Sequence, residues 1–253
     1  MNGLPDAVAQ IGLWPLVSVA GIVVFAAVLR AFTGFGFGLA AVPVFSLVMP
    51  PPEAVVLSTG LTLAVSLITL RSYWGQAPLR PMLPLFPAAA LGTVVGVGLL
   101  TRVSVEQFQL WIGISVIFAC IVLTFYRPAP RVPRQSVTVA TGLAAGLLNG
   151  AFAIPGPPVV IYAMATEREP YRARALLITF FLFSSVVALI SFSVAGFVSA
   201  RSPWLFMLAL PSMLIGDKIG YLLFRRYGGT LYRRVALLVL LAVGAATIAR
   251  ALW

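Results

Sequence analysis

The chain contains no histidine and a single cysteine, Cys120, among its 253 residues. The lack of histidine excludes histidine-ligated metal sites and the Ser-His or Cys-His pairs of nucleophilic catalysis. One cysteine excludes an intramolecular disulfide. No Walker-type P-loop is present, so ATP-driven work is not predicted. With few carboxylates inside the apolar runs, an intramembrane enzyme is disfavoured, and we expect no metal and no other cofactor.

Charged residues are also scarce, at 9% of the chain, whereas 61% of the residues are hydrophobic. That composition is typical of a multi-pass membrane protein. The net charge of +11 comes from arginines between apolar runs, which favours contacts with lipid headgroups over nucleic-acid binding. The N-terminus lacks a basic region before the first apolar run, so that run is predicted to be a retained membrane segment. We expect a multi-pass protein of a bacterial inner membrane.

Glycine and proline interrupt the apolar sequence at two matching places. The first break is Gly34-Phe35-Gly36-Phe37-Gly38, and the second, 118 positions later, surrounds Pro155-Gly156-Pro157-Pro158. Both residue types are poor helix formers. A full span needs about 20 residues, so the short runs beside the breaks, 39–49, 137–149 and 151–165, are predicted to be half-helices. Full spans are predicted at 14–32, 54–70, 82–100, 105–125, 174–197, 204–224 and 231–252.

The two halves of the chain match each other without gaps over long stretches. At an offset of 118, Ala26, Gly38 and Pro52 meet Ala144, Gly156 and Pro170, and at an offset of 124, Pro87, Gly92 and Gly96 meet Pro211, Gly216 and Gly220. This order of glycines and prolines predicts an internal duplication. The predicted organisation is an N-terminal membrane repeat at 14–126, a basic cytoplasmic linker at 127–136 and a C-terminal membrane repeat at 137–252.

The positions of the arginines distinguish two topologies. If each broken pair of helices is one straight span, the positive residues divide about evenly between the two faces. If each pair is a hairpin, twelve arginines lie on one face and only Arg102, Arg201 and Arg250 on the other, as the positive-inside rule requires. We therefore predict an all-α polytopic protein of two inverted repeats, each a broken-helix hairpin plus three transmembrane helices. Both termini are predicted to lie outside the cytoplasm.

Charged residues inside membrane spans are costly and suggest function. Arg30 lies four residues before the first break, and its match in the second half is Leu148. It could face an anion or extend to the interface. Asp217 and Lys218 lie inside the run 204–224, and neighbouring residues of a helix do not share a face. Asp217 could carry a coupling proton or pair with a remote arginine, and Lys218 could reach the interface.

Three more charged positions stand at the ends of spans. Arg172 and Arg174 open the run 174–197, either as cytoplasmic anchors or as a gate for an entering anion. Glu53 follows Pro50-Pro51-Pro52, and in the first turn of a helix its carboxylate is stabilised by the helix dipole.

The breaks themselves predict an anion site. A half-helix that begins after a break presents free N–H donors and the positive end of its dipole. We expect such ends after Gly38 and after Pro158, converging near the membrane midplane between the repeats. Pro157 and Pro158 suit a helix start, where their missing N–H costs little. The predicted substrate-binding residues are Arg30, Thr33, Gly34, Phe35, Gly36, Phe37, Gly38, Asn149, Phe152, Pro155, Gly156, Pro157 and Pro158.

Close packing is predicted where small residues are four positions apart on one helix face. Gly92-x-x-x-Gly96 has this spacing, and Gly216-x-x-x-Gly220 repeats it in the second half. Such pairs let two helix backbones approach closely.

At the breaks the chain resembles the TauE/SafE family, also called the toluene sulfonate uptake permease family. The resemblance rests on the two breaks, on Tyr171-Arg172-Ala173 and on the Phe-rich Phe180-Phe181-Leu182-Phe183, and it extends over about residues 14–250. The chain differs from the family pattern at Ile154-Pro155, where a glycine pair is commoner, and at Asp217-Lys218, where small apolar residues are usual.

The resemblance implies a secondary transporter, mostly an exporter, of small sulfur-containing anions such as sulfite, sulfoacetate and other organosulfonates. Alternating access would move one half against the other, with Arg172, Arg174, Asp217 and Lys218 as candidates for gating or coupling. A transporter of small carboxylates and an anion channel remain alternatives. The expected partners are the anionic substrate and membrane lipid, and a homodimer is left open.

Overall fold

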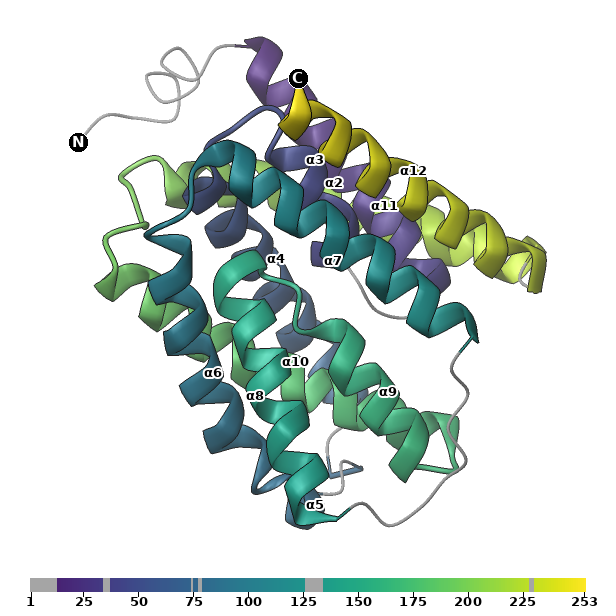
Figure 1. The fold of residues 1–253 in the computed structure, drawn as a ribbon. Helices are drawn as coiled ribbons and strands as arrows, with labels where there is room; N and C mark the ends of the chain where they lie inside the picture. Colours follow the sequence, from purple (N-terminus) through teal and green to yellow (C-terminus); the bar gives the residue numbers. More distant parts are fainter. Residues whose placement is uncertain (1–12, 34–36, 74, 77–78, 126–133, 228–229) are drawn as a thin grey trace. The chain divides into compact units, whose positions relative to one another are not determined.

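The structure is a computed structural model that describes residues 13–33, 37–73, 75–76, 79–125, 134–227 and 230–253. Every regular element among these residues is a helix (Figure 1). The chain forms two compact units, each built from segments of both predicted repeats. Unit 1 comprises Met1–Leu61, Ser104–Ile117 and Gly196–Trp253, and unit 2 comprises Thr62–Val103 and Phe118–Ala195.

Unit 1 is organised around the first helix break. Its helix α2 contacts α3, α11 and α12, and α12 also contacts α3. The helices wholly in this unit are α2 (Leu13–Thr33), α3 (Phe37–Phe45), α11 (Ser202–Tyr227) and α12 (Thr230–Leu252). The unit boundaries fall within α4 (Pro51–Leu70) and α7 (Val105–Phe125), which begin in unit 1 and end in unit 2.

Unit 2 is organised around the second break. Helices α6 and α8 lie side by side along most of their length, and α10 contacts α6, α8 and α9 (Figure 1). A core that includes Leu85, Val159 and Phe180 joins these helices. The helical elements of this unit are the 3-10 turn η1 (Arg71–Tyr73), α5 (Leu79–Met82), α6 (Leu85–Leu100), α8 (Gln135–Phe152), α9 (Gly156–Thr166) and α10 (Pro170–Val194).

Local sequence signals set several helix starts. Helix α4 begins at Pro51 and carries Glu53 in its first turn, which confirms the predicted place of that carboxylate near the positive end of the helix dipole. Ser104 precedes α7, and its hydroxyl accepts a hydrogen bond from the amide of Gln107, whose side-chain oxygen accepts one from the amide of Ser104. This reciprocal pair satisfies two amides that a helix start leaves without intrahelical partners.

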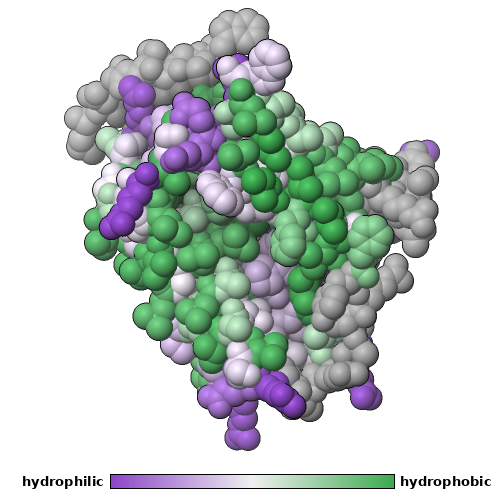
Figure 2. All heavy atoms as spheres, viewed as in Figure 1, coloured by the Kyte–Doolittle hydropathy of each residue, from purple (hydrophilic) through white to green (hydrophobic). Residues whose placement is uncertain are grey.

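The described helices have the lengths of a multi-pass membrane protein. Five segments are long and apolar enough to cross a membrane, and shorter apolar stretches, Leu16–Arg30 and Leu237–Leu252, lie within α2 and α12. Large apolar side chains stay exposed on them, for example Leu91 and Phe118 at 65% each, and apolar side chains cover most of the face drawn in Figure 2. The five are Pro51–Leu70, Leu79–Leu100, Val105–Val122, Tyr171–Val194 and Ser202–Leu223. All five coincide with predicted spans.

Glycines hold the backbones of α6 and α8 in contact. A Cβ atom on Gly92 or Gly96 of α6 would meet the α8 backbone, 2.9 Å from the amide nitrogen of Leu147 and 2.8 Å from that of Ala151, respectively. The predicted role of Gly92-x-x-x-Gly96 in close packing is therefore confirmed.

Helix α8 also has glycines four residues apart on the face that contacts α6. Their role was not predicted from the sequence. A Cβ on Gly146 would lie 2.8 Å from the amide nitrogen of Thr93, and one on Gly150 would lie 2.7 Å from that of Val97. Each backbone thus fits against the other along several turns.

Candidate functional site

The first break separates α2 from α3 in unit 1. Helix α2 ends at Thr33 and α3 begins at Phe37. Gly34, Phe35 and Gly36, predicted to bind substrate, lie outside the described residues, as does the side chain of Thr33. Helix α3 begins two residues earlier than predicted, so Phe37 and Gly38 belong to its first turn, and both are buried. Phe37, Gly38 and Leu39, each of which carries an amide N–H, are the first residues of α3 that the structure describes.

The second break separates α8 from α9 in unit 2. Helix α8 ends at Phe152, Ala153 adopts a left-handed conformation with φ of 54° and ψ of 35°, and α9 begins at Gly156. The placement of Pro157 and Pro158 in the first turn is as predicted, but the helix starts three residues earlier than expected. Because proline has no N–H, Gly156 alone offers an amide donor among the first three positions of α9.

Asn149 fixes the end of α8 against α10. Its side chain is 2% exposed, and its Nδ2 donates a hydrogen bond of 2.9 Å to the carbonyl oxygen of Ser184. One amide donor predicted to reach substrate is therefore engaged within unit 2. Phe152, at the end of the same helix, is half-buried, and Pro155 beyond it is buried.

Arg30 and Asp217 form an ion pair within unit 1. The Nη2 atom of Arg30 lies 2.6 Å from Oδ2 of Asp217, and its Nε donates to Oδ1 at 3.3 Å. The two side chains are 26% and 24% exposed. Two parallel N–H···O contacts make this a bidentate pair, the strongest common geometry for arginine and carboxylate. Of the roles considered for Asp217, pairing with a remote arginine is present in the structure.

A glycine next to Asp217 lets α11 approach α2 at this pair. A Cβ atom on Gly216 would lie 2.7 Å from the Cβ atom of Ala27 and 2.7 Å from the carbonyl oxygen of Val24. The neighbouring Lys218 is exposed, so Asp217 and Lys218 face different surroundings, as neighbours on a helix do.

In unit 2, the positions that the predicted repeat aligns with Arg30 and Asp217 carry no charge. By the repeat alignment, Leu148 corresponds to Arg30 and Thr93 to Asp217, and they belong to α8 and α6, which are also in contact. Thr93 is buried, and its hydroxyl donates to the carbonyl oxygen of Ala89 on its own helix at 2.8 Å.

The basic residues at the start of α10 contact aromatic and acidic groups of unit 2. The Nε atom of Arg172 lies 3.5 Å from Oε2 of Glu167, and the guanidinium of Arg174 lies 5.8 Å from the ring centre of Tyr73. The rings of Tyr73 and Tyr171 are 4.7 Å apart. Arg172 is 49% exposed, so its ion pair is weak.

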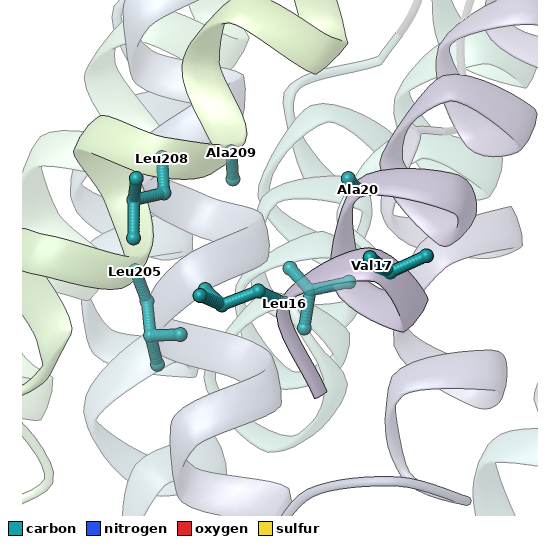
Figure 3. Close-up of a pocket in the computed structure, with 7 residues that line it drawn as sticks. Leu16, Val17, Ala20, Leu205, Leu208 and Ala209 are labelled. Atoms are coloured by element: carbon teal, nitrogen blue, oxygen red, sulfur yellow. The ribbon is translucent and has the colours of Figure 1, made fainter. Parts of the chain in front are cut away.

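A pocket of about 240 Å³ lies between the first turns of α2 and α11 in unit 1 (Figure 3). It has no charged or polar side chain in its lining, which consists of Leu16, Val17, Val19, Ala20, Leu205, Leu208 and Ala209. A desolvated anion would find no donor side chain there, so this pocket is not a candidate anion site.

Two buried polar contacts were missed by the sequence prediction. Gln109 Nε2 donates a hydrogen bond of 2.7 Å to the carbonyl oxygen of Ser46, just beyond α3. The hydroxyls of Thr138 and Tyr162 lie 3.2 Å apart inside unit 2. A polar residue in an apolar run was the available signal for both. Among the residues that the structure describes, no group of three or more His, Cys, Asp or Glu side chains could hold a metal ion.

Comparison with known proteins gives the family. The family model "Sulfite exporter TauE/SafE" matches residues 19–247. A curated protein of Cupriavidus necator, named "Probable sulfite/organosulfonate exporter TauE", is 25% identical over 247 residues, covering 92% of this chain and 93% of its own length. No solved structure matches the chain. Together with the apolar helices described above, the match over most of the chain shows that this protein belongs to the TauE/SafE sulfite exporter family and is a multi-pass membrane transporter.

Proposed function

We propose that the chain transports small sulfur-containing anions, sulfite or organosulfonates such as sulfoacetate, out of the cytoplasm across a bacterial inner membrane. The observation that carries this proposal is the family match over residues 19–247, supported by the relative named as a probable sulfite/organosulfonate exporter. An anion needs positive groups or N–H donors where it leaves water, and the chain offers both kinds next to its breaks.

The donors come from the two helix starts and from Arg30. Helix α3 begins with three residues that carry an N–H, whereas α9 begins with one such residue followed by two prolines. We therefore expect the start of α3 to contribute more hydrogen bonds to the anion than the start of α9. Arg30, three residues before the end of α2, supplies the formal positive charge. We also propose that both breaks act on the same anion near the membrane midplane.

Transport is proposed to proceed by alternating access between inverted repeats. Matching contacts inside the two units support the duplication. In unit 1, α2, which precedes the first break, contacts α11, and in unit 2, α8, which precedes the second break, contacts α6. The aligned glycines Gly216 and Gly92 lie at these two contacts. An internal repeat explains why the same contact occurs twice.

Thermal shift measurements on the purified protein test the substrate class. The panel is sulfite, sulfate, ethanesulfonate, sulfoacetate, taurine, acetate and lactate, at matched ionic strength. A ligand that binds only the folded state raises the unfolding temperature with the logarithm of its concentration. We expect stabilisation by sulfite or a sulfonate and none by acetate or lactate. Stabilisation by the carboxylates alone would instead identify a carboxylate transporter.

The first break is tested by Gly38→Leu, assayed for uptake of a binding anion into proteoliposomes. Gly38 is buried in the first turn of α3, and a leucine side chain there would occupy space at the start of this helix. Transport should be lost while the protein still elutes as a single folded species. Gly21→Leu is the matched control, because a Cβ atom on Gly21 meets nothing within 4 Å. Full transport by Gly38→Leu would contradict the proposed place of the site.

The inverted topology is tested by single-cysteine labelling. Cys120 is 1% exposed, and Cys120→Ala provides a chain without cysteine. New cysteines near Ser104 and Ser199 are expected to react from outside the cytoplasm, and cysteines near Gln76 and Glu169 from the cytoplasmic side. Labelling of the Ser104 and Glu169 sites from one side, and of the Gln76 and Ser199 sites from the other, would instead fit two straight spans and contradict the inverted repeats.

A further inference from the structure

Asp217 lies well inside its helix, and Arg30 lies in the last turn of α2, next to the first break. Asp217 is ten residues before the end of α11 at Tyr227, or about 15 Å along the axis. Arg30 is 17 residues after the start of α2 at Leu13, or about 25 Å. Charges at such depth in a spanning segment are rare unless they serve a function, and each needs a partner.

Packing of the helices does not require these charges. The corresponding contact in unit 2 is made by α6 and α8 with leucine and threonine at the aligned positions. In that contact Gly146 and Gly150 of α8 lie against the backbone of Thr93. Gly216 provides the same close approach for α11 and α2. The contact of α6 with α8 therefore forms without charged residues at these positions, whereas the contact of α2 with α11 also carries the charged pair.

The carboxylate of Asp217 occupies the guanidinium face that an anion would use. Two parallel hydrogen bonds from Arg30 to two oxygens are the arrangement that arginine also makes with sulfonate-like oxyanions. Arg30 cannot lose its proton under physiological conditions, so Asp217 is the member of the pair whose charge can change. The side chains are 26% and 24% exposed, so neither charged group is fully enclosed by the protein.

We propose that Asp217 is a proton-linked counter-ion that competes with the transported anion for Arg30. With no anion bound, ionised Asp217 pairs with Arg30. When the anion takes the Nε and Nη2 donors of Arg30, Asp217 is left without a cation and accepts one proton from water on one of its carboxylate oxygens. The net charge at the pair then stays unchanged when a monoanion binds, and one proton is bound for each anion. This inference rests on the proposed function.

Other charged and titratable groups lie near the same helices. On α11, Lys218 and Tyr221 are exposed, the guanidinium of Arg225 lies 5.8 Å from the ring centre of Tyr221, and Arg226 is in the last turn. Helix α3 contains no titratable residue. Helix α12 carries Tyr232, Arg233 and Arg234 in its first turns, with side chains outside the described set, and Arg250 in its last turn. Asp217 is the carboxylate among the groups named here, so a proton taken up when the anion binds is assigned to it.

The test is calorimetric titration of the purified protein with ethanesulfonate. This anion does not itself titrate between about pH 5 and pH 8, the range in which proton uptake by the carboxylate is measured. The heat is recorded in buffers of different ionisation enthalpy, which yields the number of protons bound per anion. We expect uptake approaching one proton, and an apparent affinity that falls as pH rises, by up to about tenfold per pH unit.

Asp217→Asn keeps the shape of the side chain and removes its charge. This variant should bind ethanesulfonate with no proton uptake, with little dependence on pH, and at least as tightly as the unmodified protein does at low pH. Glu53→Gln is the matched control, since it removes another carboxylate of unit 1, and it should retain the proton uptake. A purely structural role for Asp217 would instead weaken binding at every pH.

Proton uptake by the unmodified protein tests the proposed role of Asp217 even if Asp217→Asn does not fold. Binding of ethanesulfonate with no proton uptake would overturn the proton-linked role and leave the proposed function intact. Proton uptake that persists in Asp217→Asn would also overturn it. If neither ethanesulfonate nor sulfite binds at all, the proposed function fails, and the inference fails with it.

Discussion

Gly96 of α6 lies against the backbone of α8 so closely that a methyl group there would overlap the carbonyl oxygen of Leu147. The atoms in the way belong to the backbone, so they cannot rotate aside. Gly96→Ala should push the two helices apart and lower stability by about 1–3 kcal/mol, the usual cost of overpacking. Thermal unfolding of the detergent-purified protein measures this loss.

Gly98→Ala is the matched control for that change. Gly98 is on the same helix, two residues further, and a Cβ atom there would meet nothing within 4 Å. Alanine is also the better helix former, so Gly98→Ala should leave the unfolding temperature unchanged or raise it. Equal losses from Gly96→Ala and Gly98→Ala would mean that the close contact between α6 and α8 does not limit stability.

The contact of α6 with α8 shows how far the sequence predicts this fold. The spacing of Gly92 and Gly96 predicts a close helix contact, and the breaks predict where α3 and α9 begin to within three residues. The partner helix was not predictable, because glycine spacing identifies a face but not the helix that packs on it. The glycines of α8, such as Gly146, have the same spacing and become informative only once they are seen to face α6.

Gly216→Ala tests the corresponding contact in unit 1. Its Cβ atom would lie 2.7 Å from the Cβ atom of Ala27 and from the carbonyl oxygen of Val24. We expect a loss of about 1–3 kcal/mol in stability, because α11 must move away from α2. Gly21→Ala, at an open position of α2, should be neutral in the same unfolding assay. No difference between the two variants would contradict the contact.

The Arg30–Asp217 pair is suited to a double-mutant cycle on stability. The aligned residues Leu148 and Thr93 supply the replacements Arg30→Leu and Asp217→Thr. Each single change leaves a partly buried charge without its partner and should cost about 1–3 kcal/mol. The double variant removes both charges and should be more stable than the sum of the single losses predicts. Chemical or thermal unfolding of all four proteins gives the coupling, and purely additive losses would contradict a stabilising pair.

The sequence identified both members of this pair as costly charges inside spans but could not join them. They are 187 residues apart, and neither charge recurs at the position that the predicted repeat aligns with it, so the predicted duplication did not link them. Arg30 was predicted to face a substrate anion or to extend to the interface, and Asp217 to carry a proton or to pair with a remote arginine. Only the contact of α2 with α11 places the carboxylate on the guanidinium.

Ala153 gives a prediction at the second break, because it holds a left-handed conformation with φ of 54° directly after α8. A residue with a Cβ atom is disfavoured there, whereas glycine is not. Its amide donates the last hydrogen bond of α8 to the carbonyl oxygen of Asn149 at 2.8 Å. The left-handed conformation of Ala153 is therefore part of the end of this helix. Ala153→Gly should therefore stabilise the protein by about 0.5–1 kcal/mol, after the greater freedom of glycine in the unfolded chain is included.

Ala151→Gly, two residues earlier and inside the helix, is the control and should cost about 1 kcal/mol. Since Ala151 and Ala153 are each 5% exposed, the lost methyl group is a similar cost in both, and the difference in unfolding temperature reports the backbone conformation. If Ala153→Gly is as destabilising as Ala151→Gly, the left-handed turn is not what ends α8.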